Sequence, residues 1–409
     1  MVRGDPQGRP FARGGPPARR EGDGRGIASK APVARAILLV CALAFAQTAC
    51  AQPARRVRFD VSTIPVGRQP NDVAIADVNG DRHPDILTAN IGGRSISVLL
   101  GDGRGRFAAA PGSPFSVGIA AHLVALGDLD RDGRLDAAVT EHDGNDVTVL
   151  RGDGRGGFTP MPGSPFPLID GLAPHNHGLA LEDVNGDGLL DAATSNNNGN
   201  SVSVLLGDGR GGFRPAAGSP FPVGRAPYPL TVADLNGDGR SDVATPDVNG
   251  HTISVLLGDG RGGFAPAPGS PYRVDNRPYF AVAADVNGDR ALDLVVSHDD
   301  SSRLTVLVND GRGRFGAPRR VDAGGQTWKV RIADTNNDGR NDLVVGVSPA
   351  SVSILLGDGS GNFTRAPGSP YAVGRGPYGV AVGDLNHDGK IDVATANSER
   401  DSVSILLQR

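Results

Sequence analysis

Short apolar stretches alternate with polar turns along most of the chain, and no stretch has the spacing of an amphipathic helix. Runs such as SVSVLLG at 201–207 and DVATAN at 392–397 are bounded by Gly, Asn or Asp. Runs of this length with turn residues on both sides indicate β-strands. The 60 Gly and 31 Pro among 409 residues fit a chain of strands and tight turns. The pattern therefore predicts an all-β protein.

A nine-residue acidic stretch, such as DLNGDGRSD at 234–242, recurs through the chain. The seven copies begin at Asp77, Asp128, Asp183, Asp234, Asp285, Asp334 and Asp384, with spacings of 51, 55, 51, 51, 49 and 50 residues. Each repeat contains one expected strand before the acidic stretch and one after it. A third strand ends in GDG, and a fourth begins at a Phe ahead of PGSPF or a variant. Seven four-stranded units predict a seven-bladed β-propeller of antiparallel blades.

The two ends of the repeat region predict how the ring of blades closes. The last repeat stops after its third strand, SVSILLQR, and so lacks an outer strand. Residues 56–67 have the pattern of an outer strand with no blade before them. Pairing between the two would remove an open sheet edge. We expect residues 52–409 to form one propeller whose N-terminal strand joins the last blade.

Each acidic stretch places side-chain oxygens at positions one, three, five and nine, a donor pattern suited to Ca²⁺. Position seven would add a backbone carbonyl, and Gly at position six permits a positive φ. An ordinary Asn-Gly or Asp-Gly turn explains a single copy, but seven copies in register favour metal binding. The expected ligands are Asp77, Asn79, Asp81, His83, Asp85, Asp128, Asp130, Asp132, Arg134, Asp136, Asp183, Asn185, Asp187, Leu189, Asp191, Asp234, Asn236, Asp238, Arg240, Asp242, Asp285, Asn287, Asp289, Ala291, Asp293, Asp334, Asn336, Asp338, Arg340, Asp342, Asp384, Asn386, Asp388, Lys390 and Asp392.

Two of the seven stretches depart from this pattern. Arg82 and Arg290 stand at position six, where the other five stretches have Gly, and Pro84 stiffens the first stretch. We expect up to seven Ca²⁺ ions per chain, held most weakly by the stretches that begin at Asp77 and Asp285.

The stretches VADLNGDGRSDVAT and VGDLNHDGKIDVAT, with partner runs such as VSVLLGDGRGGF, resemble FG-GAP or VCBS repeats. They are also similar to the propeller repeats of integrin α chains. The resemblance covers about residues 56–409 and implies a calcium-binding propeller. In integrins the matching loops bind Ca²⁺ on one face and ligands dock on the opposite face. Members of the family include adhesion modules, lectins and parts of enzymes, so the resemblance leaves the function open.

Two sets of residues, one per repeat, should lie on the face away from the acidic stretches. Six residues before each stretch are Asn71, His122, His177, Tyr228, Tyr279, Trp328 and Tyr378. Thirteen residues after each start are Asn90, Glu141, Asn196, Asp247, His298, Val347 and Asn397. Aromatic, imidazole, amide and acidic groups around a concavity suit sugars or peptides. We expect ligand contacts from His122, Glu141, His177, Tyr228, Tyr279, His298, Trp328 and Tyr378. The alternative is that the Tyr side chains pack between blades.

The N-terminal region has the features of an export signal. A basic residue, Arg35, precedes an apolar run from Ala36 to Ala46 and an A-x-A site at 49–51. This run is too short to span a membrane, and we expect a secreted protein, extracellular or periplasmic. Lipid attachment at Cys50 is the less favoured alternative. The two Cys of the chain, Cys41 and Cys50, precede the propeller and exclude a disulfide framework within it.

Composition and motifs narrow the function further. Removing residues 1–51 leaves 33 basic and 42 acidic residues, a net charge of −9, which argues against nucleic-acid binding. We expect a monomeric recognition or adhesion module for glycan or protein ligands and not an enzyme. A purely structural envelope protein is one alternative. A lyase or hydrolase that uses His122, Glu141, His142, His175 and His177 as a metal or acid–base site is another.

Overall fold

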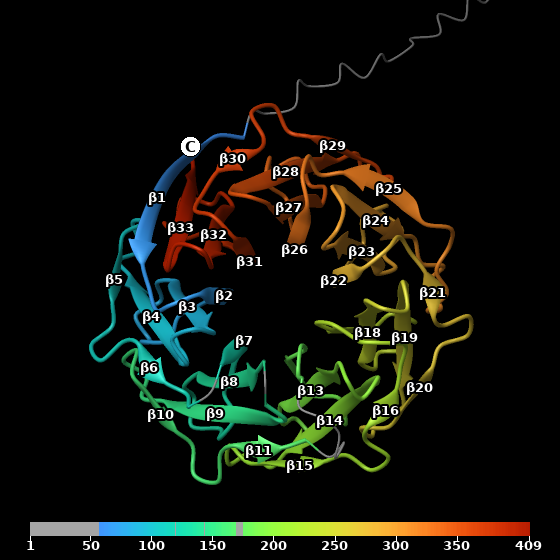
Figure 1. Ribbon diagram of the computed structural model, residues 1–409, viewed down its shortest axis with the longest axis horizontal. Helices are drawn as coiled ribbons and strands as arrows, with labels where there is room; N and C mark the ends of the chain where they lie inside the picture. The colour runs from blue at the N-terminus through green and yellow to red at the C-terminus, as the bar shows by residue number, and fades with distance from the viewer. Residues whose placement is uncertain (1–56, 119, 143, 169–174) are drawn as a thin grey trace, which may run out of the picture. The chain divides into compact units, whose positions relative to one another are not determined.

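The computed structural model describes residues 57–118, 120–142, 144–168 and 175–409. These residues contain 33 strands and no helix, and the strands form seven antiparallel sheets arranged as blades of a ring (Figure 1). The predicted seven-bladed β-propeller is therefore confirmed. The expected N-terminal extension and signal, residues 1–51, lie outside the described residues.

The blades are built from strands in chain order from the centre outward, except that the outer strand of the seventh blade is β1. The innermost strands are β2 (Pro70–Ala76), β7 (Ala121–Gly127), β12 (Ala180–Glu182), β17 (Thr231–Ala233), β22 (Pro278–Ala284), β26 (Thr327–Ala333) and β31 (Pro377–Gly383). The second strands are β3 (Asp85–Asn90), β8 (Asp136–Glu141), β13 (Asp191–Asn196), β18 (Asp242–Asp247), β23 (Asp293–His298), β27 (Asp342–Val347) and β32 (Asp392–Asn397). The third strands are β4 (Ser95–Gly101), β9 (Asp146–Gly152), β14 (Ser201–Gly207), β19 (Thr252–Gly258), β24 (Arg303–Leu307), β28 (Ser351–Gly357) and β33 (Ser402–Gln408).

The outer strand of most blades is divided into two short pieces that pair with opposite halves of the third strand. The first pieces are β5 (Phe107–Ala109), β10 (Phe158–Pro160), β15 (Phe213–Pro215), β20 (Phe264–Pro266) and β29 (Phe363–Arg365). The second pieces are β6 (Phe115–Ser116), β11 (Phe166–Pro167), β16 (Phe221–Pro222), β21 (Tyr272–Arg273) and β30 (Tyr371–Ala372). The fifth blade has the single outer strand β25 (Arg319–Asp322). Between the two pieces, the Ser of the PGSP turn accepts a hydrogen bond from the third strand, as Ser270 Oγ does from Val255 N at 2.8 Å.

The seventh blade joins the two ends of the propeller. Strand β1 (Phe59–Pro65) pairs antiparallel with β33, from Phe59 opposite Gln408 to Pro65 opposite Ser402. Figure 1 shows β1 lying along β33 at the rim of that blade. Beyond the strand, Gln69 N donates to Asp401 Oδ1 at 2.8 Å. The predicted closure of the ring is therefore confirmed.

The hydrophobic core lies between neighbouring blades rather than at the centre of the ring. The described residues form seven clusters of buried apolar side chains, and each cluster joins residues of two adjacent blades. One of them packs Leu87 and Val98 of the first blade against Ala137 and Val139 of the second. Because both faces of the second and third strands are covered in this way, those strands are buried almost throughout, as in β3 and β14.

Candidate ligand-binding and metal sites

The seven acidic stretches form turns with two residues at positive φ in each. The residue at position six has φ between 70° and 83°: it is Gly in five turns, Arg82 (φ 70°) in the first and Arg290 (φ 74°) in the fifth. The residue at position four is also left-handed, as at Gly237 (φ 75°) and Arg131 (φ 63°). The expected need for positive φ at position six is confirmed. Arg82 and Arg290 meet it in a region that residues with a Cβ disfavour.

Alternate side-chain oxygens organise the turn that contains them. In the fourth repeat, Asp234 Oδ1 accepts from Gly237 N at 2.7 Å and Asp234 Oδ2 accepts from Gly239 N at 2.8 Å. Asn236 Oδ1 accepts from Asp238 N at 2.9 Å, and Asp238 Oδ1 accepts from Arg240 N at 3.0 Å. These Asx-type contacts hold the oxygens at positions one, three and five on the same tight loop.

The Asp at position nine of each turn is buried and anchors the turn to its blade. Asp242 Oδ2 accepts from Leu235 N and Asp242 Oδ1 accepts from Gly258 N, both at 2.9 Å. The same pair of bonds occurs at Asp85, Asp136, Asp191, Asp293, Asp342 and Asp392. Burial, with smaller contributions from the carboxylates at positions five and one, raises the pKa of Asp242 to about 6. The clustered carboxylates thus repel one another in the absence of a cation.

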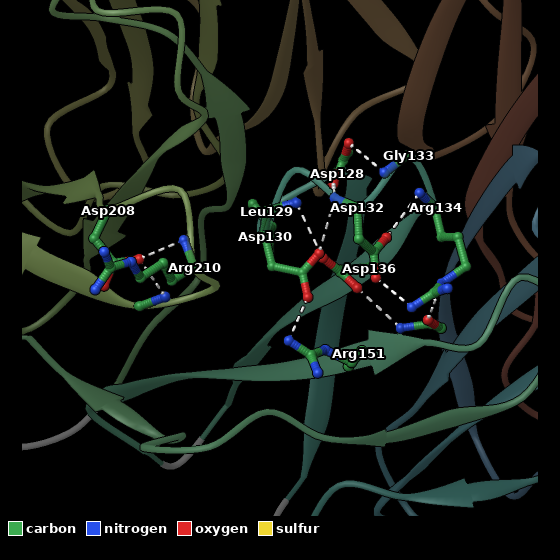
Figure 2. Close-up of polar contacts among 12 residues, drawn as sticks. Asp128, Leu129, Asp130, Asp132, Gly133, Arg134, Asp136, Arg151, Asp208 and Arg210 are labelled. Carbon is green, nitrogen blue, oxygen red and sulfur yellow. Dashed lines mark hydrogen bonds and ion pairs between the residues drawn. The ribbon is translucent and has the colours of Figure 1, made fainter.

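The second turn shows how closely its carboxylates approach (Figure 2). Asp128, Asp130 and Asp136 each offer an oxygen atom, and these atoms lie within 4.8 Å of one another. Arg151 Nη2 lies 2.5 Å from Asp130 Oδ2, and Arg134 contacts Asp132 (Figure 2). Oxygen atoms of this type at this separation fit a divalent cation such as Ca²⁺. The Asp at position nine would then both anchor the turn and bind the cation.

Six side chains, which we call the aromatic belt, form a row of ring contacts from blade to blade. They are His122, His177, Tyr228, Tyr279, Trp328 and Tyr378. His177 stacks on Tyr228 with centroids 4.2 Å apart and planes inclined by 12°. The remaining contacts are tilted or edge-on, with Trp328 at 4.5 Å from Tyr378. The four Tyr and Trp members are partly exposed, whereas His122 and His177 are buried.

A β-bulge positions most members of the belt. In the first, second, fifth, sixth and seventh blades, the pairing of the innermost strand shifts register at the belt position. Pro278 opposes His298 and Phe280 opposes Ser297, so Tyr279 is the extra residue. A bulge redirects the side chain of the residue that it inserts. The belt therefore lies at the ends of the innermost strands that are remote from the acidic turns, as the strand directions predict.

The second predicted set lies at the same end of the blades but is buried inside them. Asn90 donates from Nδ2 to Ser95 Oγ and Ser97 Oγ, at 3.2 and 3.0 Å. In the equivalent place, Glu141 Oε1 accepts from Thr148 Oγ1 at 3.0 Å and His298 Nε2 lies 2.9 Å from Thr305 Oγ1. These side chains are therefore buried and hydrogen-bonded within their own blades, including Glu141 and His298, from which ligand contacts were expected. The segment that leads into a blade covers the end of its second strand, as where Asn276 O lies 2.8 Å from His298 Nδ1, and the residue pattern does not show this.

Four of the eight His residues of the chain gather where the second and third blades meet. The rings of His142, His175 and His177 lie with centroids 4.4 to 5.0 Å apart, and His122 lies 4.9 Å from His177. Burial, together with the neighbouring His175 and His142, lowers the pKa of His177 to about 2. Burial likewise lowers the pKa of His122. Both imidazoles are therefore neutral at physiological pH.

The central channel contains charged groups that the sequence reasoning missed. Lys329 Nζ lies 2.5 Å from Asp72 Oδ1, although the two residues belong to the sixth and first blades, which are not neighbours. Both line a cavity of about 250 Å³ with Arg331 and Phe280. The sequence does contain a signal for these channel residues. Asp72 and Lys329 immediately follow belt positions on innermost strands that otherwise carry mainly apolar residues.

A second cavity, of about 550 Å³, lies on the face of the acidic turns. It is lined by residues of the third and fourth blades, including Asp183, Arg240, Asp259 and Arg261. Apart from Val184, the residues that line it are charged or are Gly or Ser, and none of the described lining residues is aromatic. This cavity and the aromatic belt therefore lie on opposite faces of the propeller.

The ring of antiparallel blades with an acidic turn in each defines the protein as a seven-bladed β-propeller. Matches to the family described as FG-GAP-like repeat cover residues 77–139, 128–194, 183–245, 285–345 and 334–395. These matches span more than half of the chain. The chain therefore belongs to the FG-GAP-like repeat family and, as the quoted motifs indicate, resembles the β-propeller of integrin α chains.

Individual proteins resemble this chain either in part of its sequence or in its fold. Cartilage acidic protein 1 of Xenopus tropicalis is 27% identical over 154 residues, which are 35% of this chain and 24% of that protein. A lectin from Agrocybe aegerita, solved for its recognition of non-reducing terminal N-acetylglucosamine, has a TM-score of 0.53 and 21% identity. The alignment covers 86% of this chain and 96% of the lectin. Virginiamycin B lyase from Staphylococcus aureus has a TM-score of 0.57 and 12% identity, with 86% and 99% covered. Identities this low show the shared fold alone.

Within the residues that the structure describes, there is no helix of the length and apolar character needed to cross a membrane.

Proposed function

We propose that this protein is an exported, calcium-stabilised recognition module that binds a glycan or protein ligand at the aromatic belt. The observation that carries the proposal is the belt itself. It places partly exposed Tyr and Trp side chains from four consecutive blades in one row, on the face opposite the acidic turns.

The chemistry of these side chains suits recognition. An aromatic ring offers a broad apolar face, and the Tyr hydroxyl and Trp N–H add a polar tip, a combination favoured at binding surfaces. The rings of Tyr279, Trp328 and Tyr378 brace one another, so they lose little conformational freedom when a ligand binds. Trp328 Nε1 also donates to Ser348 Oγ at 2.7 Å, which holds the indole in place.

The acidic turns would hold Ca²⁺ and stabilise the blades, leaving the other face for the ligand. Extracellular or periplasmic surroundings with about millimolar Ca²⁺ would fill sites of about 10⁻⁴ M affinity. The lectin of the same fold is consistent with a sugar ligand, and the partial relative from cartilage is consistent with an extracellular setting. A purely structural role remains the alternative to recognition, and the experiment below separates the two.

The experiment is a glycan array followed by titration of the best ligand. Trp328 is the only Trp in the chain, so its fluorescence reports on the belt alone. We expect binding to change this fluorescence, and Trp328→Ala to weaken affinity by about 2 kcal/mol or more. Tyr272→Ala is the matched control, because Tyr272 is an aromatic residue of the outer strand β21 and its ring contacts Phe315, which is not a belt residue. It should leave affinity unchanged.

Stability must be measured on the same variants. If Trp328 served only as core, Trp328→Ala would lower the free energy of unfolding by about 3 to 5 kcal/mol with no separate loss of binding. That result, or a ligand whose binding is unaffected by Trp328→Ala, would refute the belt as the ligand site. An array with no ligand of either class would favour the structural role.

A further inference from the structure

We propose that His142, His175 and His177 form a binding site for one divalent transition-metal ion of the zinc class. The site lies where the second and third blades meet, on the face opposite the acidic turns. It is separate from the Ca²⁺ sites, and its test does not depend on the identity of the belt's ligand.

The geometry of the three side chains is the first support. Each offers one ring nitrogen, and these nitrogens all lie within 4.8 Å of one another. A tetrahedral Zn²⁺ ion with bonds of about 2.0 Å needs its ligand nitrogens about 3.3 Å apart. Small rotations of the three rings about their side-chain torsions close that difference.

Different elements deliver the three residues. His142 directly follows β8, at the end of the second strand of its blade. His175 and His177 stand two residues apart in the extended segment that leads into β12, where alternate residues share a face. His177 N donates to Ser195 O at 3.1 Å, which fixes that segment against the second strand of the third blade. The backbone on both sides of the site is thus held by its blades.

The burial of His177 and its ring nitrogens, unpaired over the ranges that the structure describes, are the second, independent support for a metal ion. The side chain is 3% exposed, and neither Nδ1 nor Nε2 has a hydrogen-bond partner among the described residues. A neutral imidazole has one N–H donor and one acceptor nitrogen, and burying either without a partner is costly. A metal ion would satisfy the acceptor nitrogen. His122 Nδ1 is also buried and has no hydrogen-bond partner in the described part of the chain. The ring centroids of His122 and His177 lie 4.9 Å apart.

The arrangement is particular to this pair of blades. At the positions equivalent to His142, the other repeats have Ile91, Asn197, Val248, Asp299, Ser348 and Ser398. At those equivalent to His175 they have Gln69, Ala120, Ala226, Arg277, Gln326 and Gly376. The fold therefore does not require His at either position.

The ligand type selects the metal. Imidazole nitrogen suits Zn²⁺, Cu²⁺ and Ni²⁺, whereas Ca²⁺ and Mg²⁺ require oxygen ligands. Three His ligands leave a fourth tetrahedral position open. His122 is the nearest further imidazole, and Tyr228 of the belt stacks on His177. Because His177 is itself a belt residue, an ion held here would be bound in part by the aromatic belt.

The test is metal binding by the purified protein in excess Ca²⁺, which keeps the acidic turns occupied by calcium. Metal-free protein is titrated with Zn²⁺, and with Co²⁺ as a spectroscopic probe. We expect one ion per chain and the visible bands of tetrahedral Co²⁺. His175→Gln and His142→Asn should each weaken Zn²⁺ binding by at least 100-fold. Both positions are only partly buried, so these variants should keep their fold.

The matched control is the double variant His83→Gln, His387→Gln. These two His residues form another contact between ring nitrogens, His83 Nδ1 to His387 Nε2 at 3.0 Å, but on the face of the acidic turns. The control should bind Zn²⁺ like the wild type. The proposal fails if the wild type binds no Zn²⁺, if the control abolishes binding, or if correctly folded His175→Gln and His142→Asn bind as the wild type does.

Discussion

Asp247 offers a prediction in which the structure specifies both the sign and the size of the effect. Its side chain is fully buried at the end of β18, where Oδ2 accepts from Thr252 Oγ1 at 2.7 Å and from Ser254 Oγ at 2.8 Å. Among the residues that the structure describes, its Oδ1 has no hydrogen-bond partner. The first, third and seventh repeats have Asn at the same place. We predict that Asp247→Asn stabilises the protein at neutral pH.

The magnitude follows from the pKa. Burial raises the pKa of Asp247 from 3.8 to about 6. The folded state therefore binds the proton more tightly than the unfolded state. Above pH 6 the ionised carboxylate costs the folded state up to about 3 kcal/mol, from roughly two pKa units at about 1.4 kcal/mol each. This cost declines as the pH falls from 6 to 4 and is absent below the pKa of the unfolded state.

The equivalent Asn residues show that the amide fits. Asn397 Nδ2 donates to Ser404 Oγ at 2.9 Å, and Asn397 Oδ1 accepts from Thr395 Oγ1 at 2.9 Å. In Asp247→Asn the hydroxyls of Thr252 and Ser254 need only rotate to accept instead of donate. We expect a gain of about 1 to 3 kcal/mol at pH 7.5 and no difference near pH 4.

The assay is urea unfolding of the wild type and Asp247→Asn from pH 4 to 8 at constant Ca²⁺. The free energy of unfolding of the wild type is subtracted from that of the variant at each pH, so that the contributions of titrating groups common to both proteins cancel. Asn397→Asp is the reciprocal control, since it introduces a buried carboxylate, and it should destabilise most at high pH. If Asp247→Asn were destabilising at pH 7.5, or its effect did not depend on pH, the reasoning about the buried charge would be refuted.

Three further predictions concern the acidic turns and the closure of the ring. Elemental analysis of protein purified in Ca²⁺ should find several Ca²⁺ ions per chain. Chelation should lower the melting temperature sharply, because each site contributes about 1.4 kcal/mol to stability when the free Ca²⁺ concentration is ten times its dissociation constant. One ion or none per chain, or an unchanged melting curve, would mean that the turns bind no structural metal. Arg290→Gly should stabilise the folded protein by about 1 kcal/mol, since Arg290 has φ 74°. Gly239→Arg, at the equivalent position of the fourth turn (φ 80°), should destabilise it. Stabilities equal to that of the wild type would contradict backbone strain at position six. Deleting residues 52–66 removes β1 and leaves β33 with an open edge, which should cause aggregation or loss of cooperative unfolding. A monomeric product of wild-type stability would argue against closure of the ring by β1.

The sequence by itself determined the architecture because the signals for it are local. Strand length, turn residues and the repeat period are properties of neighbouring residues, and they predicted seven blades, four strands per blade and the pairing of residues 56–67 with the last strand. The positive φ at position six could also be predicted, because Gly stands there in five turns. The end of the blades at which the belt lies followed from strand direction alone.

Only the tertiary structure decided which of the residues at that end are exposed. Asn90, Glu141 and His298 looked equivalent to the belt in sequence, but the segment that enters each blade covers them. A Cβ on Gly67 would lie 2.4 Å from Asn90 Nδ2 and one on Gly224 would lie 2.2 Å from Asp247 Oδ2, so that covering segment approaches closely. The bulge at the belt, the Asp72–Lys329 contact across the channel and the convergence of His142 with His175 depend likewise on residues from different strands or blades. Distances between such residues are set by packing around the ring, and spacing along the chain does not contain them.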